Sequence, residues 1–277
     1  MLLLLLFSSC TLTSKSGRDE AGRGPTPRIL DHYKSEFYRA VGDTVKGKVS
    51  LQVLLQTLSM SNLLLLGDFH TDRGYHHRAL KLLDRVADRY GPLLLIIEFL
   101  RWEDRSDLKE YLDGHISLGL LRNRVQNRNP QSWLKQGSFD PEGFLAFLER
   151  AKERSWQVCP VENIRQPPLY LRDRIIAGRA RALIQEHHGY FPVVFYGQAH
   201  LLGNNRLEGL IGRTAVTILP RPPRSLQDCT AVNEGGLQRI RDRIFFLGPA
   251  SALELPSPPR ARIPAVPPTE NSLQCAP

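Results

Sequence analysis

The sequence predicts an α/β fold, with a mainly parallel sheet and helices on both of its faces. Apolar runs of strand length alternate with helical patterns along the chain. Two of these runs, Leu63–Leu66 and Val193–Tyr196, are each followed by a Gly-x-x-His motif, at Gly67–His70 and Gly197–His200. A continuous apolar run is typical of a strand buried on both faces. Both histidines should therefore lie at the carboxyl ends of core strands, where open α/β sheets bind ligands.

The first half of the chain predicts a parallel strand–helix–strand unit. Helical spacing is present over Arg28–Val41 and Val49–Met60, before the first strand. An amphipathic helix is predicted over Tyr75–Arg89, and Gly91-Pro92 ends it. The strand Leu93–Ile97 follows and runs into Glu98. This order has the length of a right-handed parallel crossover.

A helical insertion is expected after the second strand, over about residues 103–140. It should lie over the edge of the sheet as a lid. Short helical pieces are predicted around Leu108–Leu112 and Ile116–Val125. Pro141 then opens a helix through Glu153, with Asp140 as its N-cap. The remaining predicted elements are the strand Gln157–Val161, the helix Tyr170–His188, the strands Pro192–Tyr196 and Ala215–Leu219, and an edge strand Phe245–Leu247.

Length and composition indicate one domain, which we assign to residues 28–250. The chain has 277 residues, 42% of them hydrophobic, enough for a sizeable core. The net charge of +9 suits nucleic acid, an anionic membrane or an anionic ligand. No nucleic-acid partner is expected, because the arginines are spread along the chain without a nucleic-acid-binding signature. Residues 251–277 form a proline-rich tail.

The first ten residues look like a bacterial lipoprotein signal. The apolar run Leu2–Phe7 is too short to span a bilayer, and it ends near Cys10, the candidate lipidation site. Residues 11–27 are predicted to be a disordered leader. A lipid on Cys10 would anchor the domain to a membrane of the bacterial cell envelope, on the periplasmic or outer-surface side. Cys159 is expected to be a buried core thiol, and an oxidising compartment would allow a Cys229–Cys275 disulfide.

Titratable side chains follow four successive predicted core strands: Asp68 with His70, Glu98, Glu162 and His200. In a parallel sheet these groups share one edge. A carboxylate at the end of an apolar run, such as Glu98, is costly to bury unless it is paired or coordinates something. The candidate site therefore consists of Asp68, His70, Glu98 and His200, and Glu162 is a weaker member.

The first helix after the first motif adds nearby polar groups. His77 is the expected contributor, His76 is less favoured, and Asp72 should be the N-cap. The sequence has no Gly-x-Ser-x-Gly elbow and no phosphate-cradling loop. Three kinds of chemistry stay open: a divalent metal that activates water, acid–base catalysis without a metal, and ligation of haem iron.

The chain resembles the Tiki superfamily, and most closely its ChaN-like haem-binding uptake lipoproteins. Tiki metalloproteases and erythromycin esterases are related to them, and the expected fold is the one these proteins share. The stretches that support the resemblance are Leu63–Arg78, Leu93–Phe99, Arg172–Ala177 and Val193–Leu201. One departure is Asp68, which stands where the family commonly has glutamate.

The resemblance implies a membrane-anchored, extracytoplasmic protein that binds haem or a metal in iron uptake, and it implies a homodimer. Histidine side chains would hold the haem, namely His70, His77 and His200. The arginines Arg73 and Arg78 would pair with its propionates. The alternative is a hydrolase in which His70, Glu98 and His200 hold Mn, Co or Zn.

On the hydrolase hypothesis Asp68 and Glu98 are the catalytic carboxylates, and Asp68 or Glu162 accepts the proton. A third hypothesis is a lipoprotein that only binds other proteins and whose histidines are structural. It predicts neither a bound ligand nor an activity.

Overall fold

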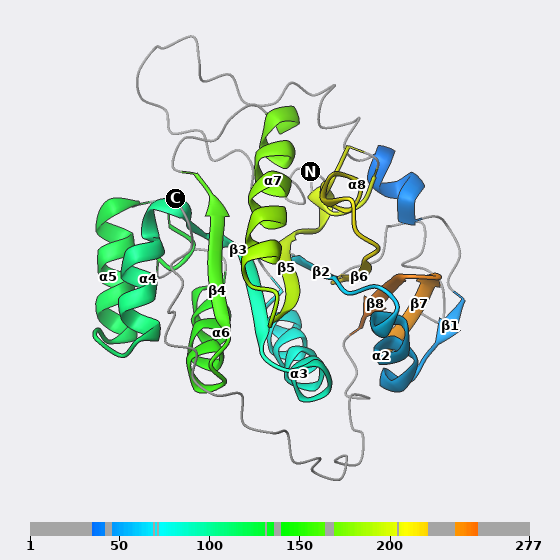
Figure 1. Ribbon diagram of the computed structural model, residues 1–277, viewed down its shortest axis with the longest axis horizontal. Coiled ribbons are helices and arrows are strands. Elements are labelled where there is room, and N and C mark those ends of the chain that lie inside the picture. The colour runs from blue at the N-terminus through cyan, green and yellow to red at the C-terminus, as the bar shows by residue number, and fades with distance from the viewer. Residues whose placement is uncertain are drawn as a thin grey trace.

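A computed structural model describes residues 35–41, 46–68, 70, 72–130, 132–135, 140–163, 169–203, 205–220 and 236–248. Over these residues the chain forms an eight-stranded sheet in the order β1-β7-β8-β6-β2-β5-β3-β4 (Figure 1). The strands are β1 (Gly47–Lys48), β2 (Leu64–Asp68), β3 (Leu93–Arg101), β4 (Gln157–Glu162), β5 (Phe191–Gly197), β6 (Val216–Leu219), β7 (Leu237–Arg241) and β8 (Ile244–Leu247). Cys10, the leader, the proposed Cys229–Cys275 pair and the proline-rich tail lie outside the described residues.

Helices connect the strands. Residues 35–41 are helical. The other helices are α2 (Leu51–Ser59), α3 (Arg73–Tyr90), η3 (Trp102–Asp104), α4 (Arg105–Leu112), α5 (Leu118–Arg128), α6 (Pro141–Glu153), α7 (Leu169–Glu186), η4 (Gln198–His200) and α8 (Leu207–Ile211). None of the described helices combines the length and the apolar character needed to cross a membrane.

Most of the sheet is parallel, which confirms the predicted fold class. The strands β8, β6, β2, β5, β3 and β4 pair in parallel, whereas β7 is antiparallel to both β8 and β1. In the centre, β2 and β5 pair with Asp68 opposite Gly197. This register brings the ends of the two Gly-x-x-His strands side by side.

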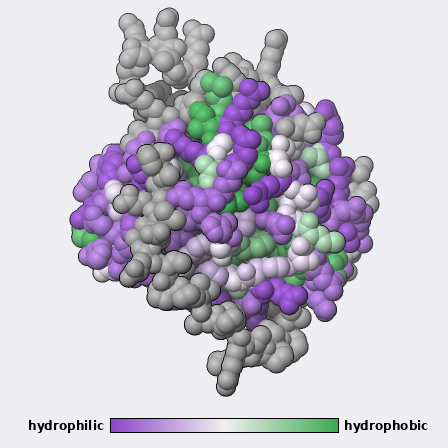
Figure 2. All heavy atoms as spheres, viewed as in Figure 1, coloured by the Kyte–Doolittle hydropathy of each residue, from purple (hydrophilic) through white to green (hydrophobic). Residues whose placement is uncertain are grey.

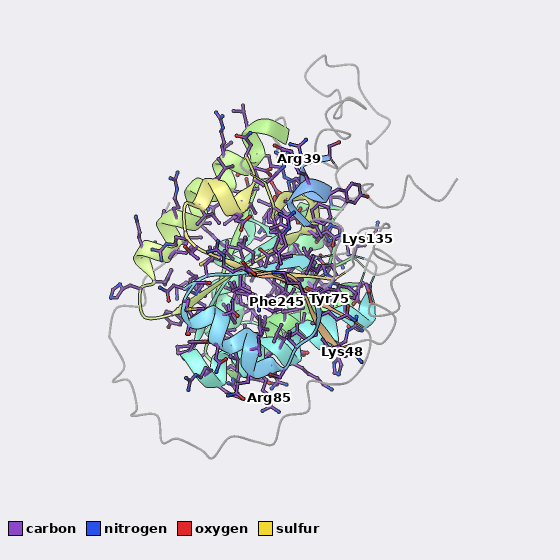
Figure 3. The ribbon with its side chains drawn as sticks, turned by 90° about the vertical axis from the view of Figure 1, so that its right-hand side faces the viewer. Arg39, Lys48, Tyr75, Arg85, Lys135 and Phe245 are labelled. Carbon is purple, nitrogen blue, oxygen red and sulfur yellow. The ribbon has the colours of Figure 1, made fainter. Side chains whose placement is uncertain are left out.

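The sheet separates two hydrophobic cores, as the alternation of side chains along a strand requires. In β2, Leu64 and Leu66 belong to one core, whereas Leu65 belongs to the other, and all are fully buried. Helices α2 to α6 pack on the first face, and residues 35–41, α7 and α8 pack on the second. Figure 3 shows these two helical layers on opposite sides of the strands, with the labelled Tyr75 beneath the sheet. Cys159 is buried in the second core, as predicted.

The capping residues of two helices are confirmed. Helix α6 runs from Pro141 to Glu153, and the Asp140 carboxylate accepts the Gly143 N–H at 3.2 Å. Helix α3 is capped by Asp72, which accepts the Tyr75 N–H at 3.0 Å. The predicted insertion after the second strand is also present, as η3, α4 and α5.

One prediction about the strands is wrong, and one strand was missed. The strand around Phe245 is not an edge strand, because β8 lies between β6 and β7. Strand β7 was not predicted, since Gln238, Arg239 and Arg241 interrupt its apolar pattern. In addition, β3 continues past Glu98 to Arg101. Its pairing with β5 ends at Ile97, while its pairing with β4 resumes at Arg101 after a register shift.

Helix α7 has one buried face and one outer face. Its buried positions, such as Ile176 and Ala180, pack into the second core. On the outer face Leu171 and Ile175 are each 38% exposed, and apolar side chains reach the surface in this part of the view in Figure 2. Near its start, α7 places Arg172 and Asp173 inside the protein, where both are buried.

Candidate functional site

Three predicted site residues, which lie just after β2, in β3 and in the turn after β5, meet around Gly197. A Cβ atom at Gly197 would lie 3.3 Å from Glu98 Oε2, 3.5 Å from His200 Cδ2 and 4.0 Å from His70 Cε1. All three side chains are buried. The parallel pairing of β2, β5 and β3 explains the convergence, because the carboxyl ends of these strands share one edge of the sheet.

His70 is held by the neighbouring carboxylate of Asp68. Its Nδ1 contacts Asp68 Oδ2, and the other Asp68 oxygen lies 2.7 Å from His76 Nε2. Burial by itself would raise the pKa of Asp68, but the contacts with His70 and His76 outweigh it and hold the pKa well below its usual range. Asp68 is therefore an ionised acceptor that fixes the orientation of His70.

His200 has a carboxylate partner of its own, which the sequence analysis did not identify. Its Nδ1 lies 2.7 Å from Asp173 Oδ1, near the start of α7. The guanidinium of Arg206 lies 3.7 Å from the second Asp173 oxygen, and the Tyr196 ring meets the His200 ring edge-on at 5.3 Å. The site thus contains two buried histidine–aspartate pairs, and both histidines lie near Gly197.

Glu98 is held by hydrogen-bond donors on both of its oxygens. The Arg172 guanidinium donates to Oε1 and the Gly197 backbone N–H donates to Oε2, each at 2.7 Å. Arg172 also donates to Glu162 through Nε at 2.8 Å, and the Tyr196 hydroxyl donates to the same Glu162 oxygen at 2.5 Å. Glu162 therefore neutralises Arg172, and it is connected to Glu98 through this arginine.

These contacts do not fit the metal set predicted from His70, Glu98 and His200. The positive Arg172 guanidinium already lies 2.7 Å from one Glu98 oxygen, and it would repel a cation bound to the same carboxylate. Over the described part of the chain, no group of three or more His, Cys, Asp or Glu side chains is arranged to hold a metal ion. We therefore derive no step through a metal.

The predicted insertion reaches the site. The ring of Trp133 lies 4.1 Å from the His70 ring, centroid to centroid, and 5.7 Å from the ring of Phe144 in α6. Trp133 is itself only partly exposed. The segment between α5 and α6 therefore covers one face of His70.

The paired histidines at the start of α3 take different positions from those expected. His77 is exposed, whereas His76 is buried between Asp68 and Asp140, at 2.7 Å from each. The helix begins at Arg73, two residues before the predicted start, and this sets which of the two side chains points inward. Burial lowers the pKa of His76, but its hydrogen bonds to the two aspartates outweigh burial and raise it above the usual value.

The two arginines predicted to contact haem are on the same helix. Arg78 is half-buried, and its Nε atom has no hydrogen-bond partner in the described structure. The side chain of Arg73 lies outside the described residues.

The arrangement has the groups that acid–base chemistry requires. Each imidazole has a carboxylate on Nδ1, which fixes the ring and stabilises its protonated form. Glu98 adds a negative charge beside both rings, and Arg172 keeps that charge compensated. Burial raises the pKa of Tyr196 well above its usual value, so its hydroxyl remains a donor to Glu162.

Comparisons with known proteins give distant likenesses in fold. No family model matches the chain, and no curated protein matches it. The C-terminal region of Pasteurella multocida toxin, described as having a thiol-protease-like catalytic triad, is 12% identical with a TM-score of 0.47 over 63% of this chain. The type III effector HopBA1 is 15% identical, with a TM-score of 0.41 over 74% of this chain and 96% of the effector.

ChaN of Campylobacter jejuni, whose structure is described as showing cofacial haem binding, is 12% identical with a TM-score of 0.46 over 64% of this chain and 88% of ChaN. In the match with Pasteurella multocida toxin, the aligned part spans only a quarter of the toxin chain. All three likenesses are at 15% identity or less.

Proposed function

We propose that this chain is a hydrolase in which His70 and His200 act as an acid–base pair. One observation supports the proposal above the others. Two histidines that follow separate strands, each bonded through Nδ1 to a buried aspartate, lie together with Glu98 within 4.0 Å of the position of a Gly197 Cβ. Titratable groups that gather at the ligand-binding edge of a parallel sheet favour function.

The proposed reaction is hydrolysis of an ester or amide. One imidazole takes a proton from water through Nε2 while the water oxygen forms a bond to the carbonyl carbon. The other imidazole, initially protonated, gives its proton to the leaving oxygen or nitrogen as the carbon–heteroatom bond breaks. Asp68 and Asp173 stabilise whichever ring is positively charged. Product release and proton exchange with solvent restore the starting state.

The carboxylates differ in role on this proposal. Asp68 orients His70, since its depressed pKa makes it a poor proton acceptor near neutral pH. Glu98 holds the turn after β5 through the Gly197 N–H and supplies negative charge next to both imidazoles. The sequence hypothesis that Asp68 or Glu162 is the base is thereby replaced by a histidine base.

A substrate screen with matched variants tests this function. Purified protein is assayed on chromogenic esters and fluorogenic peptides, with and without a chelator, together with His70→Ala, His200→Ala and the exposed-residue control His115→Ala. We expect an activity that falls about 10²- to 10⁴-fold in the first two variants and is unchanged in the control. The chelator should have no effect. Activity that survives in His70→Ala and His200→Ala would contradict the proposal.

Haem binding is a second candidate, and one observation favours it. An imidazole with a carboxylate on Nδ1, such as His70, is typical of histidines that ligate metals. The indole of Trp133 lies 4.1 Å from this ring, so it is next to the place that a porphyrin on His70 would take. Haemin titration of the wild type and of Trp133→Ala decides the matter. A saturable Soret shift that disappears in His70→Ala supports haem, and featureless absorption in both proteins counts against it.

The anchor and the dimer stay predictions. Membrane attachment depends on Cys10, which lies outside the described residues. Detergent partitioning of the full chain and of Cys10→Ser tests the anchor, and light scattering tests the dimer.

A further inference from the structure

A continuous series of contacts connects the start of α6 with His70. Asp140 Oδ2 lies 2.7 Å from His76 Nδ1, His76 Nε2 lies 2.7 Å from Asp68 Oδ1, and Asp68 Oδ2 contacts His70 Nδ1. All four side chains are between 1% and 7% exposed. They come from β2 and the residues after it, from α3, and from the end of the insertion.

The protonation of His76 follows from these contacts. Carboxylate oxygens accept hydrogen bonds but do not donate them, so a ring with a carboxylate on each nitrogen must carry both protons. His76 is therefore an imidazolium that donates to Asp68 and to Asp140. Its ring packs against Phe144 at 4.7 Å and, edge-on, against Phe195 at 6.1 Å. Because an uncompensated charge in such surroundings is costly, both aspartates are needed to keep it there.

Gly143 shows how closely this cluster is fitted to α6. A Cβ atom at Gly143 would lie 2.2 Å from Asp140 Oδ2 and 2.6 Å from His76 Nδ1. Any larger residue would push the aspartate and the imidazole apart. Asp140 also caps α6 through its other oxygen, at 3.2 Å from the Gly143 N–H. The same carboxylate thus fixes the beginning of a helix and the charge of a buried histidine.

We infer that Asp140 is a positioning residue, which keeps His76 doubly protonated and thereby orients Asp68 and His70 for catalysis. With both protons in place, His76 occupies one Asp68 oxygen and leaves the other to His70. Loss of the Asp140 carboxylate changes the charge next to Asp68. The catalytic importance of these contacts rests on the proposed function of His70. The double protonation of His76 does not depend on that function.

The replacement Asp140→Asn tests the inference with little change in shape. To keep the cap, the asparagine oxygen must accept the Gly143 N–H, so its amide N–H₂ faces His76 Nδ1. That nitrogen must then accept, and His76 becomes neutral with its proton on Nε2. Long-range ¹H–¹⁵N correlation of the ring nitrogens at about pH 7 reports this directly. We expect two protonated ring nitrogens on His76 in the wild type and one in the variant, with a changed His70 signal.

The exposed residue Asp113, at the end of α4, supplies the matched control. Asp113→Asn should leave the ring-nitrogen signals of both histidines unchanged. If Asp140→Asn does not fold, Asp140→Ser replaces it, because serine retains the capping oxygen. A neutral His76 in the wild type overturns the inference. So does an unchanged His70 signal in a folded Asp140 variant.

Rates separate this inference from the proposed function. If both hold, Asp140→Asn lowers kcat about ten- to a hundredfold with little change in KM, as expected when an outer partner of a site residue is lost. Altered ring-nitrogen signals in a protein that hydrolyses nothing would refute the hydrolase and leave the positioning role intact. A kcat equal to that of the wild type, with clear hydrolysis, would overturn the catalytic role of Asp140.

Discussion

At the scale of single residues, the site depends on the absence of one side chain. Gly197 leaves open the point where Glu98, His70 and His200 approach each other within 4.0 Å of a missing Cβ. Its backbone, with φ −49° and ψ 127°, is one that any residue can adopt. The backbone conformation at Gly197 does not require glycine. The site requires it because it leaves open space beside Glu98, His70 and His200.

The replacement Gly197→Ala should separate activity from stability. The added methyl group makes one tight contact of 3.3 Å with Glu98 and otherwise ordinary contacts, so the free energy of unfolding should change by less than about 1 kcal/mol. Because the methyl fills space beside the two imidazoles that the substrate would use, hydrolysis should fall about 10²-fold. Urea denaturation and kcat/KM measure the two effects. Unchanged activity would show that the reaction takes place elsewhere.

His76 should make stability depend on pH. Its pKa in the folded protein is raised above 6.5, so its contribution is complete below about pH 6.5 and is lost as pH rises through the folded-state pKa. Each unit of increase corresponds to about 1.4 kcal/mol. Asp68 stays ionised in both states over this range, since its pKa is lowered from 3.8.

The measurement compares the free energy of unfolding of the wild type with that of His76→Gln from about pH 5 to pH 9. We expect the difference to shrink as pH rises. The exposed residue His188 provides the control, His188→Gln, which should differ little from the wild type at any pH. A pH-independent difference for His76→Gln would rule out a charged His76.

At the scale of elements, the start of one helix contacts residues of two strands. Near the start of α7, Arg172 reaches Glu98 of β3 and Asp173 reaches His200 after β5. Neighbouring residues on a helix point about 100° apart, so these two side chains can reach the ends of two different strands. The position of α7 therefore affects how Glu98 and His200 lie relative to each other.

Further along, α7 contains a glycine with open space around it in the part of the chain that the structure describes. A Cβ atom at Gly178 would meet no atom of the described residues within 4 Å. Gly178→Ala should therefore raise the free energy of unfolding by about 0.5–1 kcal/mol, since glycine is a poor helix former. Urea denaturation measures the gain, and activity should not change. A loss of stability would mean that something packs closely against this part of α7.

At the scale of the whole molecule, the last described hairpin completes the sheet. Strand β8 pairs with β6 on one side and β7 on the other. Phe245 and Leu247 fill the first core, and Phe246 fills the second. Since each buried side chain contributes roughly 1.5–3 kcal/mol, the hairpin supplies an amount comparable with the 5–15 kcal/mol by which proteins are stable.

A chain that ends at residue 235 should therefore fail to fold. It lacks β7 and β8, and it exposes the paired edge of β6 to solvent and to other chains. Near-ultraviolet circular dichroism and the soluble fraction after expression test this. Phe245→Leu in the full chain is the control, and it should fold. Cooperative unfolding of the truncated chain at the wild-type midpoint would contradict the prediction.

The sequence was sufficient for the sheet and for the outline of the site, but not for its supporting groups. Apolar runs mark buried strands, and the residues just after them, His70 and His200, share one edge. Asp173 and His76 could not be identified in this way, because their roles depend on the rotation and packing of α7 and α3. Strand β7 escaped prediction for a related reason: Gln238 is buried within a strand whose pattern is mostly polar.

The strand order also has a consequence for the folding pathway. Strand β5 lies between β2 and β3, although the chain passes through β2, β3 and β4 before it reaches β5. Pairings between such distant segments form slowly, because the chain loses the entropy of closing a long loop before the new contacts stabilise it. During synthesis a nascent chain that ends before β5 contains His70 and Glu98 without His200. The proposed acid–base pair therefore assembles only when the central strand is inserted, and an incomplete or proteolytically shortened chain has no competent site.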